Sequence, residues 1–275
     1  MTITARTRVY RSCWLASLSF AAAAALAAAG MGPDILSAAG QLQGLPISMA
    51  GPGLLGRHPV FFSIAAGVLC SAYGIVVLSI LSFRYSRTVS MELFFFAFWA
   101  LSLSAEVLRV ESLRGALGGY AVLESSMITR FILCMRFLGM FSLFTGSLYS
   151  AGYSSEKHAV TIGGVFLVSL AMGTGLPVNT GTFGVDLLQR MGYPGLFRFL
   201  AVTCFLGSGA NYLLAARITG EKGYYTAAAG CALIFAGGFM LQSAADPVSV
   251  ILGPAGLAAG TAMFLRKIHS YYLWL

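Results

Sequence analysis

The sequence has very few charged residues: Asp, Glu, Lys and Arg occupy only 9% of its 275 positions. A soluble domain needs roughly a quarter of its residues charged to cover its surface. Hydrophobic residues account for 58%, and the mean hydropathy is +0.82. The chain therefore cannot present a polar surface to water, which excludes the soluble globular classes.

The chain also lacks the short motifs that carry common chemistry. It contains no HExxH, GxSxG or phosphate-loop pattern. The five cysteines are isolated within apolar runs and form no CxxC, so we expect them to be small packing residues. The three histidines fall at segment edges or in loops, which argues against a haem or metal held between helices. We therefore predict no cofactor, no metal and no catalytic residue, and an enzyme is the less favoured class.

What the sequence has instead is a series of apolar runs, each about long enough to cross a bilayer, for which a helix needs roughly 20 residues. Their unbroken apolar character favours helices over the alternating pattern of a membrane β-barrel. We predict an all-α fold, a polytopic transmembrane helix bundle with seven spans over residues 60–265. The predicted spans are Val60 to Phe83, Met91 to Val110, Phe131 to Tyr149, Ala159 to Val178, Leu196 to Ala216, Tyr224 to Ser243 and Val248 to Leu265.

An eighth apolar run, Trp14 to Ala29, precedes these spans and leaves two interpretations open. It follows three arginines and ends in three alanines, which is the pattern of a cleavable signal peptide. An uncleaved first helix would have the same features. Residues 1–29 are thus a signal peptide or a first transmembrane helix. Residues 30–59, rich in Gly, Pro and Ser, are expected to form an exported linker.

Basic residues predict the orientation, because Lys and Arg gather in cytoplasmic loops. If the amino end is cytoplasmic, ten basic residues fall inside and three outside. We therefore predict a multi-pass protein of the cell inner (plasma) membrane whose residues 266–275 form a short cytoplasmic tail. The inside set is Arg6, Arg8, Arg11, Arg84, Arg87, Lys157, Arg217, Lys222, Arg266 and Lys267, and the outside set is Arg57, Arg114 and Arg190.

Charged residues inside the spans point to a site, since each costs about 2.5 to 3.5 kcal/mol at mid-span and normally faces a partner or water. Glu106 and Arg109 are three residues apart near the outer end of one span. Arg136 and Arg198 lie at similar depth near the outer ends of two others. These four residues predict an anion site, in which arginines hold a carboxylate or phosphate. The structural alternative is that Glu106 pairs with Arg109 or Arg136 and locks two helices together.

Other polar and small residues favour helix packing. Asn211 and Gln242 are predicted to hydrogen bond across helices. Gly256 and Gly260 form a GxxxG pattern, which favours close helix contact within the bundle or between copies. The glycine-rich segment Gly173 to Gly184 lacks the ending of a phosphate loop and predicts a flexible turn.

The order of segments resembles a known family. The aromatic run Met91 to Leu101 leads to Glu106, and the following span contains Arg136-Phe137-Leu138-Gly139-Met140. In these features the chain is similar to the seven-helix membrane input modules of bacterial histidine kinases and diguanylate cyclases. Such modules feed an output domain, whereas this sequence stops after its last span. The resemblance therefore implies either a sensor whose output is a separate partner protein or a function other than signalling.

Three functional hypotheses remain open at this point. The first is a non-enzymatic sensor or accessory subunit with an anion site near the outer face. The second is a small permease or transporter subunit, and the third is a lipid-modifying enzyme that uses Glu106. The expected partners are the lipid bilayer and a separate cytoplasmic signalling or transport protein, with a second copy of the chain left open. Nucleic acid is not expected, because the basic residues lie in short loops where they meet lipid headgroups.

Overall fold

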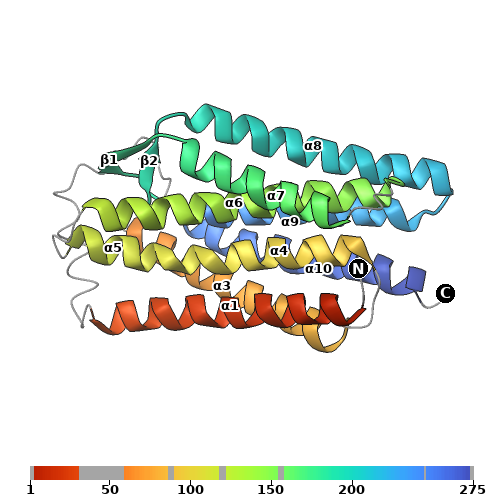
Figure 1. Cartoon of the computed structure of the whole chain (residues 1–275), viewed down its shortest axis with the longest axis horizontal. Helices are drawn as coiled ribbons and strands as arrows, with labels where there is room; N and C mark the ends of the chain where they lie inside the picture. Colours follow the sequence, from red (N-terminus) through yellow and green to blue (C-terminus); the bar gives the residue numbers. More distant parts are fainter. Residues whose placement is uncertain are drawn as a thin grey trace.

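The computed structural model describes residues 3–30, 59–85, 90–117, 122–153, 158–244 and 246–272. These residues contain eight helical segments that are long and apolar enough to cross a membrane, which confirms the predicted all-α bundle (Figure 1). The helices are α1 (Ile3–Gly30), α3 (Pro59–Phe83), α4 (Met91–Ser104), α5 (Arg109–Leu117), α6 (Val122–Ser150), α7 (His158–Gly175), α8 (Pro194–Thr219), α9 (Gly223–Gln242) and α10 (Pro247–Tyr272).

The third span is not one regular helix. A single 3₁₀ turn, η3 (Ala105–Leu108), joins α4 to α5, and both Glu106 and the adjoining Arg109 lie at this junction. In a 3₁₀ helix side chains three residues apart lie directly above one another. The turn therefore brings the Glu106 and Arg109 side chains onto the same face.

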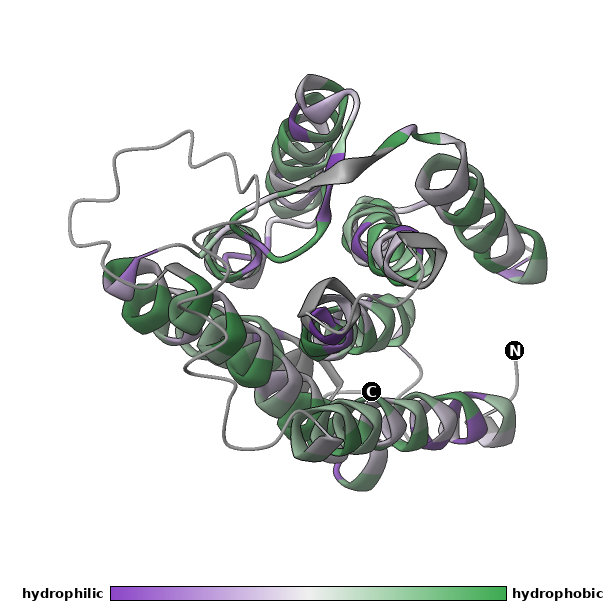
Figure 2. Ribbon diagram, turned by 90° about the vertical axis from the view of Figure 1, so that its left-hand side faces the viewer, coloured by the Kyte–Doolittle hydropathy of each residue, from purple (hydrophilic) through white to green (hydrophobic). Residues whose placement is uncertain are grey.

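The helices form a core around α4. Its aromatic run is almost entirely buried, and α4 packs against α1, α3 and α6. The peripheral helices instead expose large apolar side chains, and Figure 2 shows that hydrophobic residues dominate the helices of the bundle. Leu167 on α7 is 70% exposed and Phe199 on α8 is 66% exposed. Such surfaces are compatible with hydrocarbon as the surrounding solvent, not with water.

Small residues allow close helix contacts. Gly139 on α6 lies against Trp99 and Ser102 of α4, and a Cβ at this position would overlap their side chains. Between α9 and α10, a Cβ on Gly260 would lie 2.6 Å from the Gly230 carbonyl oxygen. The predicted close contact of Gly256 and Gly260 thus occurs within the bundle.

The segment between α7 and α8 differs from the sequence prediction. It forms an antiparallel hairpin of β1 (Val178–Phe183) and β2 (Gln189–Met191), with Val178 paired with Met191. The predicted flexible turn was therefore wrong over β1, and the preceding helix ends at Gly175 rather than at Val178. The strand contains Val, Thr and Phe, which favour extended backbone, and pairing with β2 gives partners to the two ends of the strand.

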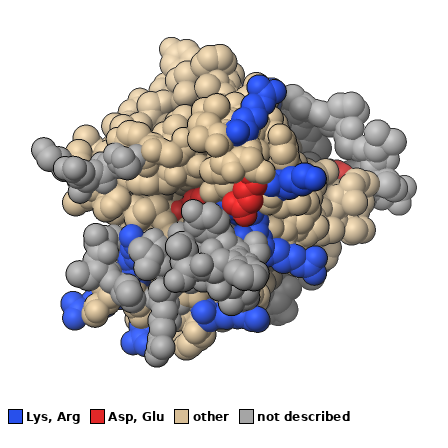
Figure 3. All heavy atoms as spheres, turned by 90° about the vertical axis from the view of Figure 1, so that its right-hand side faces the viewer, with Lys and Arg blue, Asp and Glu red and all other residues tan. Residues whose placement is uncertain are grey.

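Both chain termini lie at one end of the bundle, and the hairpin and α5 lie at the other (Figure 1). Lys and Arg side chains gather on the termini end in Figure 3, the end that the sequence analysis assigned to the cytoplasm. The orientation in a cell and the cleavage of residues 1–29 stay predictions. Residues 31–58 of the predicted linker lie outside the described residues. The predicted tail is helical through Tyr272, because no Gly or Pro follows Leu265 to end α10.

Candidate functional site

A buried carboxylate with two guanidinium groups forms the centre of the site. Glu106 is fully buried, and Arg109 and Arg136 are 0% and 5% exposed. Arg109 donates to Glu106 Oε2 from Nε at 2.7 Å and also from Nη2. Arg136 donates from Nε to Oε1 at 2.8 Å and from Nη2 to Oε2 at 3.1 Å. Both oxygens of Glu106 are thereby hydrogen-bonded to cations, which is what a buried charge requires.

The helix packing described above brings these groups together. Arg136 lies on α6 three residues before Gly139, which packs against Trp99 and Ser102 of α4. Its guanidinium therefore reaches across to Glu106 in the neighbouring 3₁₀ turn. Arg109 reaches the same carboxylate from its own segment.

The other donors of the two arginines bind the end of α9 and the hairpin. Arg109 Nη2 donates to the Gln242 carbonyl at 3.2 Å, and Arg136 Nη2 donates to the same oxygen at 3.4 Å. Gln242 is the last residue of α9, where carbonyl groups lack helical partners and carry the negative end of the helix dipole. Arg136 Nη1 donates to Asp186 Oδ2 at 3.2 Å. We call Glu106, Arg109, Arg136 and Asp186 the hairpin-side network.

The hairpin loop holds Asp186 in place. Leu187 has φ of 62°, a left-handed conformation that costs a non-glycine residue about 1 to 3 kcal/mol. Leu187 and Leu188 are both buried, so their packing offsets this cost. On β2, the Gln189 amide donates to Thr129 Oγ1 of α6 at 3.2 Å, which fastens the hairpin to the bundle. Asp186 is thus positioned by tertiary contacts.

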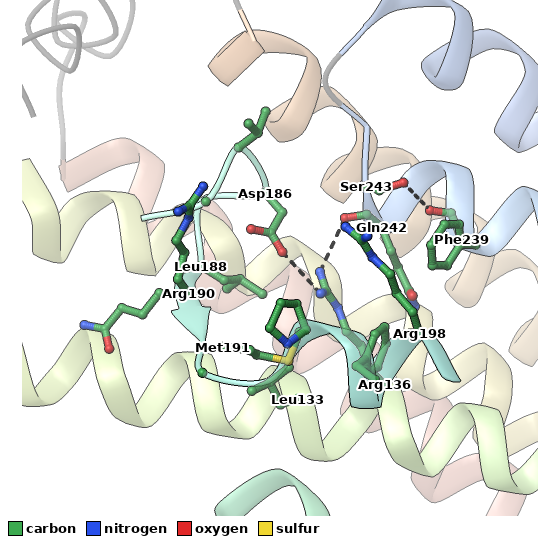
Figure 4. A pocket seen from close by; sticks show the side chains of 16 residues that line it. Leu133, Arg136, Asp186, Leu188, Arg190, Met191, Arg198, Phe239, Gln242 and Ser243 are labelled. Carbon is green, nitrogen blue, oxygen red and sulfur yellow. Dashed lines mark hydrogen bonds and ion pairs between the residues drawn. The ribbon is translucent and has the colours of Figure 1, made fainter. Parts of the chain in front are cut away.

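A cavity of about 680 Å³ opens beside this network (Figure 4). The hairpin, α6, the start of α8 and the end of α9 supply its walls, and Arg136 and Asp186 form its inner surface. Arg190 and Arg198 are exposed at its rim. Arg198 makes no hydrogen bond or ion pair with any residue that the structure describes. Three arginines face one carboxylate across the cavity, so its potential is positive.

The structure separates the four predicted ligand-binding residues into two groups. Glu106, Arg109 and Arg136 meet in the hairpin-side network. This is the arrangement expected if Glu106 pairs with these arginines and locks two helices together. Arg198 lies on the cavity instead, and Arg109 is not among the described residues that line it. Asp186, which the sequence analysis did not nominate, neutralises the network together with Glu106, so that two carboxylates face two guanidinium groups. In the sequence, the only signal for Asp186 was its position in a loop between two predicted spans.

The two predicted packing residues make different contacts. Asn211 Nδ2 donates to Ser147 Oγ at 2.9 Å and so joins α8 to α6. Gln242 contributes its backbone carbonyl to the two arginines, while its side chain lines the cavity. Asn211 therefore serves helix packing, and Gln242 belongs to the site.

A second buried charged pair lies near the other end of α4. Lys267 on α10 is 4% exposed, and its Nζ lies 3.8 Å from Glu92 Oε1. The same Nζ lies over the Tyr224 ring, 3.3 Å from its centroid. We call Glu92 and Lys267 the termini-side pair. The sequence analysis placed Lys267 among the cytoplasmic basic residues and did not anticipate that its side chain is buried.

The fold and its apolar surface define a multi-pass membrane protein embedded in a lipid bilayer. Comparisons with family models, curated proteins and solved structures give no match. The resemblance to sensor input modules therefore stays a prediction, and the site itself has to supply the argument for function.

Proposed function

We propose that this protein is a sensor-like or accessory membrane protein that binds an anion in the cavity beside Arg136 and Arg198. The observation that carries the proposal is the guanidinium of Arg198 at the rim of a positive cavity, where no residue that the structure describes pairs with it. Arg109 and the Nε of Arg136 already donate hydrogen bonds to protein acceptors, namely Glu106 and the Gln242 carbonyl. No described residue accepts a hydrogen bond from Arg198, so its donors are available for a ligand within the part of the chain that the structure describes.

The chemistry of the rim selects the ligand class. A guanidinium presents two parallel N–H groups that match a carboxylate or a phosphate. A cavity of about 680 Å³ lies within the range of small-molecule sites, roughly 300 to 1,000 Å³. It opens at the end of the bundle opposite both termini, which the positive-inside rule assigns to the outer face.

The test uses Arg198→Ala, because Arg198 has no structural partner among the described residues. In detergent, orthophosphate should raise the thermal unfolding midpoint of the wild type relative to chloride at equal ionic strength. Arg198→Ala should keep the midpoint without ligand and lose the phosphate-dependent rise. Arg136→Ala would be a poor probe, since it also opens the hairpin-side network.

Arg217→Ala is the matched control, because Arg217 is an exposed arginine at the opposite end of the same helix. It removes the same charge from α8 and should leave the phosphate response unchanged. A wild type that ignores phosphate and small carboxylates, or an Arg198→Ala variant with the full response, would overturn the proposal.

A further inference from the structure

A second, apolar cavity continues from the rim of the first. It has a volume of about 320 Å³ and runs between α8 and α9. On α8 its lining residues Arg198, Ala201, Val202 and Phe205 follow the spacing of one helical face. Apart from Arg198, all of its lining side chains are apolar. We call this cavity the α8/α9 groove.

The two cavities share Arg198 and Phe239. One end of the joined space is therefore polar and positive, and the other is apolar. Val202 and Phe239, on the groove walls, are 55% and 44% exposed, so the groove opens toward the surrounding hydrocarbon. A ligand that fills both parts needs an anionic head and a hydrocarbon chain.

We propose that the occupant is a membrane phospholipid with an anionic phosphodiester headgroup, one of whose chains lies in the α8/α9 groove. This inference rests on the proposed function, because it identifies the anion of the same site. The phosphate lies beside Arg198, where the two cavities meet. The cavity beyond it has room for a hydroxyl-bearing head, for which Asp186 and the Gln242 side chain supply hydrogen-bonding groups.

The bilayer itself sets which part of the lipid gives selectivity. A chain that leaves lipid for the groove gains little hydrophobic free energy, because lipid tails are as apolar as the groove walls. Discrimination among lipids must then come from the headgroup and the arginines. A lipid also reaches the groove sideways from the membrane, with no need to enter from water.

The experiment compares a blocked groove with an intact one. Ala201→Phe fills the α8/α9 groove without changing an arginine, and Ala210→Phe makes the same change at an exposed position of α8 outside the groove. Purified protein is titrated with phosphatidylglycerol, phosphatidylethanolamine, a long-chain fatty acid and water-soluble glycerol phosphate. Thermal unfolding midpoints and native mass spectra report binding.

We expect phosphatidylglycerol to bind the wild type and Ala210→Phe equally. Ala201→Phe should lose about tenfold in affinity for this lipid and keep its response to glycerol phosphate. Arg198→Ala should lose both responses. Ala201→Phe with wild-type lipid affinity, equal binding of all four ligands, or preference for the fatty acid or for phosphatidylethanolamine would overturn the inference. If glycerol phosphate still binds when one of these outcomes is found, the proposed function survives and only the lipid inference fails. If none of the anions binds, both proposals fail.

Discussion

The third span, which runs from α4 through η3 into α5, carries two largely buried acids whose surroundings differ strongly. Glu106, in the hairpin-side network, receives four hydrogen bonds from two arginines. Glu92, in the termini-side pair, has one ion-pair partner among the described residues, Lys267, at 3.8 Å. A buried charge costs little only when all of its acceptors are satisfied. The comparison shows that the hairpin-side network holds its helices in a fixed arrangement, whereas the termini-side pair is a looser contact.

The largest predicted effect comes from removing the central acid. Glu106→Gln leaves two buried guanidinium groups facing each other, and we expect it to lower the free energy of unfolding by about 3 to 5 kcal/mol. Reversible unfolding in mixed detergent and dodecyl sulfate micelles would measure this loss. Glu111→Gln is the control, since Glu111 pairs with Arg114 at the surface at 3.6 Å, and it should cost at most about 1 kcal/mol. Equal losses of unfolding free energy in the two variants would contradict the prediction that burial makes Glu106 the more costly acid to remove.

A smaller effect is expected for the other acid of the third span. Glu92→Gln removes the ion pair but leaves Lys267 over the Tyr224 ring, which still stabilises its charge. The free energy of unfolding should fall by about 1 to 2 kcal/mol, less than half the loss for Glu106→Gln. The same micelle titration compares them directly. A loss as large as that of Glu106→Gln would show that the termini-side pair is as tightly integrated as the network.

The smallest effect on stability, with a gain in binding, is predicted for Asp186. Its carboxyl is 25% exposed and competes with a ligand for Arg136 Nη1. Asp186→Asn should change stability by less than about 1 kcal/mol and raise phosphate affinity on the order of fivefold. The phosphate dependence of the unfolding midpoint measures the gain. Glu221→Gln, which removes an acid at the termini end, should leave the phosphate affinity unchanged. An equal gain in affinity in this variant would show that net charge, and not the position of Asp186, causes the effect.

The sequence predicted the spans and part of the site, because both depend on local patterns. Apolar runs of bilayer length place α3 to within one residue at its start, and the three-residue spacing of Glu106 and Arg109 predicts their pairing. Similar depth in the membrane correctly suggested that Arg136 could reach Glu106. These inferences need only helix geometry and the cost of charge in hydrocarbon.

The remainder of the site depends on tertiary contacts that no local pattern contains. Asp186 reaches Arg136 because β2 is fastened to Thr129 on α6, sixty residues earlier in the chain. Arg198 lines the cavity together with residues from the start of α8 and the end of α9, and this placement cannot be read from its depth in the span. The burial of Lys267 likewise follows from the packing of α10 beside α9, where small residues allow close approach.

The 3₁₀ turn between α4 and α5 also determines the length and twist of its membrane span. Such a helix advances about 2.0 Å and turns about 120° per residue, against about 1.5 Å and 100° in an α-helix. If the four residues of η3 relaxed to α-helical geometry, the span would shorten by about 2 Å and everything beyond Leu108 would rotate by about 80°. Contacts between Glu106 and the neighbouring α6 oppose that unwinding. The ion pair of Glu106 with Arg136 thus ties this overwound segment to α6, and α1 and α3 pack against the same turn, so that the direction in which α5 points depends on all three neighbours.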